Sequence, residues 1–358
     1  MLNKELEISK HEELTNKSDD STCNNSNVIG CNQDLANNSN IAMKHSYTFE
    51  EAFEIFSLPF FKLLRTAHEV HIKYWDEQAV QISDILSVKT GGCSEDCAYC
   101  AQSVRNGNKM PRQPMVDIDT VIKKAKEAKE RGASRFCMST AGRCLSNPIE
   151  FDKICKMVKA VHDLGMETCV TIGFLTNEQA KKLKESGLDY YNHNVDTSPE
   201  FYGNIVTTRT IQDRINTIEI VQNAGINVCS GGIVGMGETN KDRVKMLVLL
   251  SNLKTPPRCV PLNKLVKIPG TRVDDSHPID DFDFIRLIAL ARILMPKSYV
   301  KIAAGRNTLS ESTQALCMFA GANALFSGEK LLTVENIKDG KDINLFNKLN
   351  IVLEKKSE

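Results

Sequence analysis

The chain has 358 residues, and its 41% hydrophobic and 25% charged content is ordinary for a globular protein. Lys plus Arg and Asp plus Glu both number 45, so there is no basic field to hold a nucleic-acid backbone. No apolar run approaches the ~18 residues of a membrane span, and no basic and apolar signal segment opens the sequence. Composition therefore argues against nucleic-acid and membrane partners and predicts a cytoplasmic location. Twelve cysteines in a reducing compartment suggest metal binding or catalysis rather than disulfides.

Composition divides the chain into three segments. Residues 1–46 have no Phe, Tyr or Trp and few β-branched side chains, and half of residues 21–40 are Asn or Ser. Such an extension buries too little apolar area to offset chain entropy and is predicted to be disordered. One domain is expected over residues 47–350, followed by a C-terminal tail at 351–358.

A helical lead-in at about 48–75 precedes an alternation of β-rich runs with amphipathic segments. A capping box at Thr176 and Gln179, and Thr210 before an apolar stripe, mark two helix starts. Glycines stand at helix-to-strand junctions, where a C-cap favours a left-handed residue: Gly132, Gly165, Gly187 and Gly225. Eight strands are expected at about 83–90, 135–140, 167–173, 189–195, 227–234, 259–267, 299–304 and 322–327. This pattern predicts an α/β fold, a (β/α)8 barrel of the TIM type. An open Rossmann-like sheet is less favoured, because no G-x-G-x-x-G opens a helix after the first strand.

A cysteine triplet follows the first expected strand in the run Gly91-Gly92-Cys93-Ser94-Glu95-Asp96-Cys97-Ala98-Tyr99-Cys100. The spacing Cys-x-x-x-Cys-x-x-Cys puts three thiols on one loop at the C-terminal end of that strand, where barrel enzymes keep their chemistry. A 4Fe-4S cluster normally takes four thiolates, so three would leave one iron open, as in a reactive metal site. A zinc site short of one ligand and three unrelated cysteines are the alternatives.

The triplet resembles the motif of the radical S-adenosylmethionine superfamily, which has this spacing and an aromatic residue, here Tyr99, before the last cysteine. The resemblance implies that Cys93, Cys97 and Cys100 hold a 4Fe-4S cluster whose open iron is chelated by S-adenosylmethionine. Electron transfer into the sulfonium would then release a 5′-deoxyadenosyl radical. The cofactor carries this chemistry, and the protein positions and shields it.

Three further cysteines are spaced to converge inside the barrel. The distance from the junction glycine is five residues for Cys137 and four for Cys169 and Cys229, so their thiols should lie at nearly the same depth. Side chains alternate along a strand, so Arg135 and Ser139 should face inward with Cys137. The alternative is that these are ordinary buried cysteines, which pack as small apolar side chains.

Amides and a carboxylate are predicted on one face of the fourth strand, at Asn192, Asn194 and Asp196, with a further amide at Asn263. Buried polar groups need hydrogen-bond partners, so a polar ligand or an internal polar network is expected there. The glycines of the fifth strand, including Gly231 and Gly232, would let a ligand approach the backbone. Because side chains alternate along a strand, His193 is predicted to point outward, where it would serve as a packing residue.

Several stretches together resemble the biotin synthase family over about residues 48–350: the triplet, Arg135 to Met138, Tyr190 to Tyr202, Val228 to Gly235, and Ala304 to Arg306. The resemblance implies insertion of sulfur into dethiobiotin to give biotin, the final step of biotin biosynthesis. Cys137, Cys169 and Cys229 would hold a 2Fe-2S cluster that donates the sulfur, and no catalytic side chain beyond the clusters is implied. A flavodoxin or ferredoxin-type electron donor and a homodimer are also implied.

The same resemblance gives roles to the polar residues. Contacts with S-adenosylmethionine are implied for Tyr99, Asn194, Asp196, Gly231 and Gly232, and contacts with the ureido ring of dethiobiotin for Asn192, Asn194 and Asn263. Thr333, after the last strand, matches a position near the substrate carboxylate.

One position departs from the family pattern. The fourth ligand of the second cluster is an arginine on the seventh strand, and Lys301 stands at the matching place. Arg and Lys differ in reach, planarity and ease of deprotonation. Lys301 either ligates the cluster or lies beside it as a cation and leaves one iron to another donor.

Two other functions compete with this interpretation. A radical methyl or carbon-skeleton enzyme could share the barrel, but it would not need Cys137, Cys169 and Cys229 at one depth. A zinc-stabilised binding protein would need no catalytic site at all. The iron content separates these possibilities from a protein with two clusters.

Overall fold

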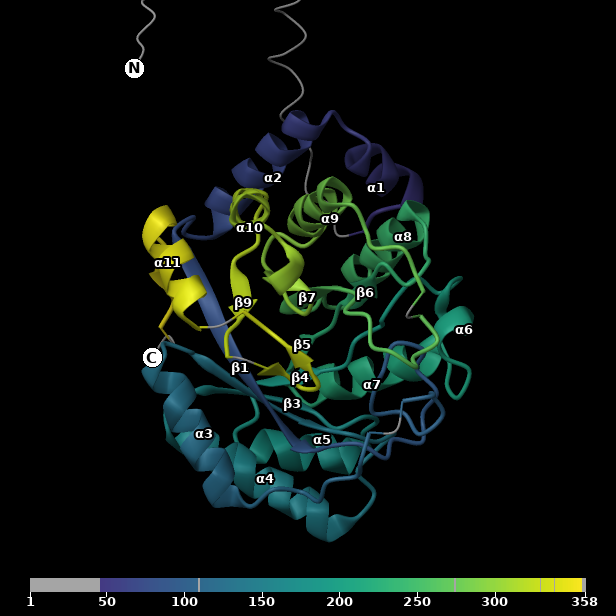
Figure 1. Ribbon diagram of the computed structural model, residues 1–358, viewed down its shortest axis with the longest axis vertical. Coiled ribbons are helices and arrows are strands. Elements are labelled where there is room, and N and C mark those ends of the chain that lie inside the picture. Colours follow the sequence, from purple (N-terminus) through teal and green to yellow (C-terminus); the bar gives the residue numbers. More distant parts are fainter. Residues whose placement is uncertain (1–45, 109, 274, 329, 338, 356–358) are drawn as a thin grey trace, which may run out of the picture. The chain divides into compact units, whose positions relative to one another are not determined.

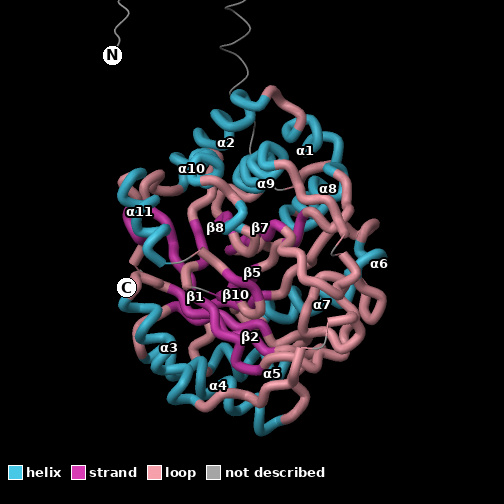
Figure 2. Tube along the Cα trace, in the orientation of Figure 1, coloured by secondary structure: helices cyan, strands magenta, loops and turns pink. Residues whose placement is uncertain are grey.

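The computed structural model describes residues 46–108, 110–273, 275–328, 330–337 and 339–355. Except for Ser46, the extension predicted over residues 1–46 lies outside the described residues. Strands gather at the centre of the described part, with helices around them (Figures 1 and 2).

A closed barrel of parallel strands forms this centre, as the sequence predicts. Its strands are β1 (Ala79–Lys89), β2 (Arg135–Thr140), β3 (Glu167–Thr171), β4 (Tyr190–Asn192), β5 (Asn227–Cys229), β6 (Gly232–Val234), β7 (Cys259–Lys264), β8 (Tyr299–Ile302) and β9 (Ala324–Phe326). Neighbours pair in chain order, and β9 pairs with β1 to close the ring. The fifth barrel position is shared by β5 and β6, which both pair with β7 and are separated at Ser230 and Gly231.

Three short strands lie outside these eight positions: β10 (Lys330–Leu331), β11 (Val334–Glu335) and β12 (Val352–Leu353). The first two form an antiparallel hairpin after β9. The third belongs to the predicted C-terminal tail and pairs in parallel with the start of β1. The tail thus pairs with the N-terminal end of the first barrel strand, just before the residues of β1 that pair with β9.

The helices are α1 (Phe49–Phe56), α2 (Phe60–Tyr74), α3 (Ile118–Glu130), α4 (Pro148–Asp163), α5 (Asn177–Glu185), α6 (Tyr202–Ile205), α7 (Ile211–Asn223), α8 (Asn240–Ser251), α9 (Asp281–Leu294), α10 (Glu311–Phe319) and α11 (Asp339–Leu349). The predicted capping box of Thr176 and Gln179 is present, and Thr210 forms a second one with Asp213. All four predicted junction glycines have a positive φ, between 70° and 91°. The local signals in the sequence therefore set the boundaries of these helices.

Burial follows from where each element lies. The α9 helix is buried on nearly every side, because it lies between the barrel and the lead-in helices α1 and α2 (Figure 1). A helix that is apolar all round is expected in such a place. Along β2, every side chain is buried, since one face meets the helices and the other the barrel interior. Within the described residues, no helix is long and apolar enough to cross a membrane.

His71 makes the stability of this helical layer depend on pH. The side chain lies on α2 and is 2% exposed, and burial, aided by the positive charge of Arg292, lowers its pKa to about 3. The folded chain keeps His71 neutral at pH values where the unfolded chain binds a proton. Between about pH 6.5 and pH 3 the free energy of unfolding should therefore fall as the pH falls, by up to about 4 kcal/mol from this group. Replacing it, as His71→Gln, should remove that part of the pH dependence measured by urea unfolding.

The exposed His277 provides the matched control. The His277→Gln variant should keep the pH dependence of the wild type, because its side chain meets water in both states. An unchanged acid dependence in His71→Gln would contradict the role given to burial at His71.

Candidate active site

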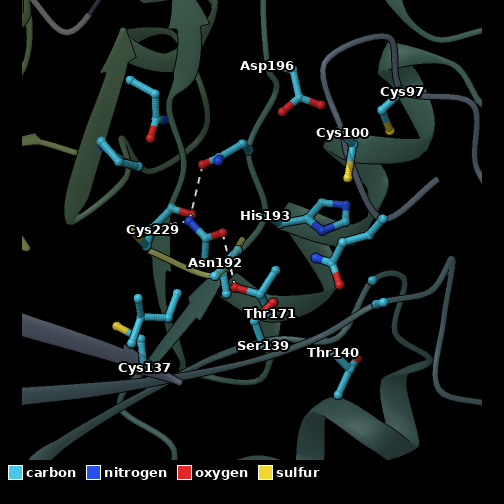
Figure 3. A pocket seen from close by; sticks show the side chains of 18 of the residues that line it. Cys97, Cys100, Cys137, Ser139, Thr140, Thr171, Asn192, His193, Asp196 and Cys229 are labelled. Atoms are coloured by element: carbon cyan, nitrogen blue, oxygen red, sulfur yellow. Dashed lines mark hydrogen bonds between the residues drawn. The ribbon is translucent and has the colours of Figure 1, made fainter. Parts of the chain in front are cut away.

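A cavity of about 290 Å³ opens into the barrel interior, at the C-terminal ends of the strands. The predicted residues that line it are Cys93, Cys97, Tyr99, Cys100, Cys137, Cys169, Asn192, Asn194, Asp196, Cys229, Asn263 and Lys301. In Figure 3, Cys97 and Cys100 lie at one end and Cys137 at the other, with Asn192 between them. The structure therefore brings both predicted sets of thiols to one cavity.

The cysteine loop begins directly after β1 with two left-handed glycines, Gly91 at φ 73° and Gly92 at φ 72°. An added Cβ would lie 2.5 Å from a backbone oxygen at the first of these positions, so only glycine fits this turn. The side-chain amide of Asn106 then donates to the backbone oxygens of Cys97 at 3.0 Å and Cys100 at 2.9 Å. These bonds fix the backbone that carries the thiols before any cofactor arrives.

Buried ion pairs attach the cysteine loop to the segment that precedes α7. Arg209 lies 2.7 Å from Glu95, and its other nitrogen donates to the sulfur of Cys97 at 3.1 Å. Burial alone would raise the pKa of Asp96, but hydrogen bonds from Thr207 and Thr208 outweigh it and hold the pKa well below its usual range. Asp96 therefore stays ionised and ties the loop to the same segment.

Burial also raises the pKa values of two rim thiols, Cys97 and Cys100. It raises the pKa of Cys97, against the attraction of Arg209, and raises the pKa of Cys100 to about 12. Both groups are therefore neutral thiols in the metal-free chain. Metal ligands must be thiolates, so loading this site would release protons.

The surroundings of the rim thiols fit an iron-sulfur cluster. The three rim thiols share one wall of a cavity that continues past them into the barrel. A cluster spreads its ligands over several metal atoms and needs such space between them.

The deep thiols come from the interior faces of β2, β3 and β5. Cys137 and Cys169 are direct partners in the parallel register, and each shifts the pKa of the other. Together with Cys229 they pack in a single buried cluster. Arg135 and Ser139 line the cavity beside Cys137, which confirms the parity expected for β2.

Two buried cations face these thiols. The Lys301 ammonium donates to the hydroxyl of Ser83 at 2.6 Å and lies 4.3 Å from the centre of the Phe326 ring. The Arg135 guanidinium pairs with Glu167 at 2.8 Å, and within the described residues its buried Nη1 has no hydrogen-bond partner. An unpaired buried donor beside several thiols fits an anionic group between them.

A hydrogen-bonded amide layer lies between the rim and the deep thiols. Asn192 accepts from Thr171 at 3.1 Å and donates to Asn194 at 3.1 Å and to the sulfur of Cys229 at 3.4 Å (Figure 3). Asn263 donates to the oxygen of Gly232 at 2.9 Å. These contacts fix the direction of each amide, as a site for a flat polar ligand requires.

Asp196 has an unusual backbone for a non-glycine residue, with φ at 69°. Its carboxylate lies 3.0 Å from Arg214 and 3.6 Å from Arg209, and the side chain is 2% exposed. Non-glycine residues in this conformation are uncommon and often occur at functional sites. The carboxylate borders the cavity near the rim thiols, as Figure 3 shows.

Three predicted residues do not line the cavity. An added Cβ at Gly231 would lie 1.9 Å from the oxygen of Pro261, and one at Gly232 would lie 2.5 Å from the oxygen of Asp196. Neighbouring backbone thus approaches both glycines closely, and at Gly232 the sulfur of Met246 would lie nearer still to the added Cβ, at 2.1 Å. Thr333 is half-buried in the turn between β10 and β11, and its neighbours Leu331 and Leu332 line the cavity instead. The ligand contacts of these three residues stay predictions.

The sequence reasoning was wrong about His193 and did not single out four other residues. His193 lines the cavity, because β4 ends at Asn192 and strand parity no longer applies one residue later. The residues not singled out are Glu95, Arg209, Arg214 and Cys259. Only Cys259 carried a usable signal, since it shares the inward parity of Asn263 on β7.

Two family models match the chain. The model of the Radical SAM superfamily matches residues 87–250, which include the rim thiols and the deep thiols of β2, β3 and β5. The model of the Biotin and Thiamin Synthesis associated domain matches residues 261–352, which include Asn263, Lys301 and Thr333. Both halves of the cavity wall therefore lie in matched segments.

Relatives match along most of their length. A biotin synthase from Photorhabdus laumondii is 52% identical over 313 residues, covering 87% of this chain and 90% of the relative. One from Vesicomyosocius okutanii is 53% identical over 310 residues, covering 86% and 95%. The crystal structure of a methylornithine synthase superposes with a TM-score of 0.72 at 17% identity, covering 87% of this chain and 95% of that one. This last likeness concerns the fold alone.

Arg209 should be needed for the stability of the cysteine loop. The Arg209→Met variant would leave Glu95 buried beside fewer positive charges, so the free energy of unfolding should fall by about 3 kcal/mol. Urea unfolding of the metal-free chain under reducing conditions measures this difference.

The exposed pair of Lys124 and Glu127, at 2.7 Å, provides the comparison. The free energy of unfolding of the Lys124→Met variant should fall by less than about 1 kcal/mol, because ion pairs on the surface contribute little to stability. Equal losses in the two variants would show that Arg209 is not a buried anchor.

Proposed function

This chain belongs to the biotin synthase family, and from that membership we propose how its residues carry out the conversion of dethiobiotin to biotin. It is a sulfur-inserting enzyme of the radical S-adenosylmethionine type. The single observation that carries the assignment of residues is the presence of two sets of thiols at two depths of one cavity, with amides between them. A rim site, a substrate layer and a deep site are what such a reaction requires.

At the rim, Cys93, Cys97 and Cys100 would hold the 4Fe-4S cluster. The left-handed glycines and the amide of Asn106 fix the loop, so the thiols need little reorganisation when the cluster binds. Three thiolates leave one of the four ligand positions open for S-adenosylmethionine. Asp196 would contact this cofactor through its buried carboxylate. Two arginines, Arg209 and Arg214, hold that carboxylate in place.

At depth, Cys137, Cys169 and Cys229 would hold a 2Fe-2S cluster. The support for this is their shared packing cluster, together with the positive charges of Arg135 and Lys301 beside them. When bound, the cofactors would supply the radical that removes hydrogen from dethiobiotin and the sulfur that takes its place. All three thiols are nearly fully buried, so the chain would shield a cluster held there from bulk solvent.

Between the two thiol sets, the amides would hold the ureido ring of dethiobiotin. The Oδ1 atom of Asn194 accepts hydrogen bonds from Asn192 and from the backbone of Gly231. Its Nδ2 atom has no acceptor among the described residues, so it would donate to a ligand. Thr171 fixes Asn192 in the same way. Fixed amides lower the cost of orienting the substrate, which matters because the reacting carbons carry no polar group of their own.

The most direct test is anaerobic reconstitution of the full chain with iron and sulfide, followed by addition of dethiobiotin, S-adenosylmethionine and a reductant. Biotin detected by mass, with about six irons per chain, is the expected result. About four irons per chain would contradict the deep cluster, and a colourless zinc protein would contradict both clusters. A cytoplasmic location, a flavodoxin or ferredoxin-type donor and a homodimer remain predictions.

The Cys97→Ala variant should lose cleavage of S-adenosylmethionine. Two thiols do not hold a four-iron cluster reliably, so the variant should show at least about a hundredfold slower release of 5′-deoxyadenosine by chromatography. The Cys317→Ala variant is the control, since that buried cysteine lies on α10 outside the cavity lining. Wild-type cleavage by Cys97→Ala would contradict the rim assignment.

The Lys301→Arg variant should still form biotin. Arginine keeps the positive charge that faces the deep thiols, and the family resemblance places arginine there. Biotin yield per chain should stay within about threefold of the wild type. A folded variant with a full complement of iron but no biotin would show that the lysine itself is required.

A further inference from the structure

A fourth thiol, that of Cys259, belongs to the deep set. Cys259 is 0% exposed and packs in the same buried cluster as Cys137, Cys169 and Cys229. We infer that Cys259, rather than Lys301, supplies the fourth protein ligand of the deep cluster. This inference rests on the proposed function, because it requires a 2Fe-2S cluster at that site.

The four thiols occur as two matched pairs. Cys137 and Cys169 are register partners on β2 and β3, and Cys229 and Cys259 are register partners on β5 and β7. In each pair the two thiols are close enough to shift each other's pKa. A 2Fe-2S cluster held by four cysteines takes two thiolates at each iron, so two adjacent pairs match what it needs.

The direction of Cys259 follows from β7. Pro261 and Asn263, two and four residues later, both line the cavity, so strand alternation points Cys259 to the same interior. Its thiol lies below the lining, against Cys229. Cys155 and Cys317 differ from it, because they are buried cysteines on the helices α4 and α10.

Lys301 already has partners that suit a cation. Its ammonium donates to Ser83 and lies over the Phe326 ring, on the side of the barrel formed by β1 and β9. To bind iron it would have to give up a proton, whereas a thiol is the usual donor to iron-sulfur clusters. Lys301 lines the cavity with Cys137 and Cys229, and its positive charge acts on both of these thiols and on Cys259.

Charge balance supports the same assignment. An oxidised 2Fe-2S core with four thiolates carries two negative charges, and a buried charge needs compensation. Lys301 and Arg135 are two buried cations that face this thiol set, and the Nη1 atom of Arg135 has no hydrogen-bond partner within the described residues. These two cations, of which Arg135 is also paired with Glu167, partly compensate the two negative charges of a cluster held by four thiolates.

The decisive measurement is 57Fe Mössbauer spectroscopy of the anaerobically reconstituted full chain without S-adenosylmethionine. With Cys259 as ligand, both ferric sites of the deep cluster have four sulfur donors and should give matching isomer shifts. The Lys301→Met variant should keep the two isomer shifts matched, even where loss of a compensating charge lowers the amount of deep cluster. Two unequal ferric sites in the wild type, one of them altered by Lys301→Met, would overturn the inference without any need for a cysteine variant.

The Cys259→Ser variant provides the second arm, with Cys317→Ser as the matched buried control. An oxygen donor at one iron should make the two deep sites unequal and shift the visible absorption of the cluster to shorter wavelength. Loss of about two irons per chain, with the unfolding temperature of the metal-free protein unchanged, would also support the inference. A spectrum and iron content equal to those of Cys317→Ser would overturn it.

Failure of the proposed function and failure of the role of Cys259 would give different results. A wild-type chain with about four irons and no deep-cluster signal would contradict the function and, with it, the role of Cys259. A wild-type chain with about six irons that forms biotin, but has unequal deep sites tied to Lys301, would overturn the role of Cys259 alone.

Discussion

The alternation of side chains along parallel strands is the constraint on which this site depends. Every second residue of a closed barrel faces one shared interior, so residues far apart in sequence must meet there. Cys137, Cys169, Cys229 and Cys259 come from four strands and pack in one cluster for this reason. Barrel interiors are usually filled by branched apolar residues, and thiols and amides in their place leave room for ligands.

The rim of the site is organised differently, since its thiols lie on a loop. A loop has no ladder of hydrogen bonds to fix it, and here buried side chains take over that role. Glu95 pairs with Arg209, and Asp96 accepts hydrogen bonds from Thr207 and Thr208. The loop is therefore attached to the segment before α7, more than a hundred residues away in sequence. Its stability should depend on those buried charges more than on the cysteines.

The thiols at the two ends of the cavity are thus held in position by different interactions. At depth, strand register fixes the thiols, and the cations Lys301 and Arg135 compensate their charge when they ionise. Between the two ends, Thr171 and Asn192 orient an amide layer through hydrogen bonds that need no ligand. A site that is ordered before binding loses little entropy when its ligands enter, which favours precise positioning over induced fit.

The sequence by itself determined the barrel, because glycine C-caps, capping boxes and β-rich runs act over a few residues and recur in chain order. It also placed Cys93, Cys97 and Cys100 on one loop, and Cys137, Cys169 and Cys229 on inward faces. Only the tertiary structure decided that Arg209 meets Glu95, that His193 turns into the cavity where β4 stops, and that Cys259 completes a second thiol pair. Those contacts depend on strand register and on the packing of distant loops. The alternation along β7 indicates that Cys259 faces inward, but no local pattern in the chain says which side chain it meets there.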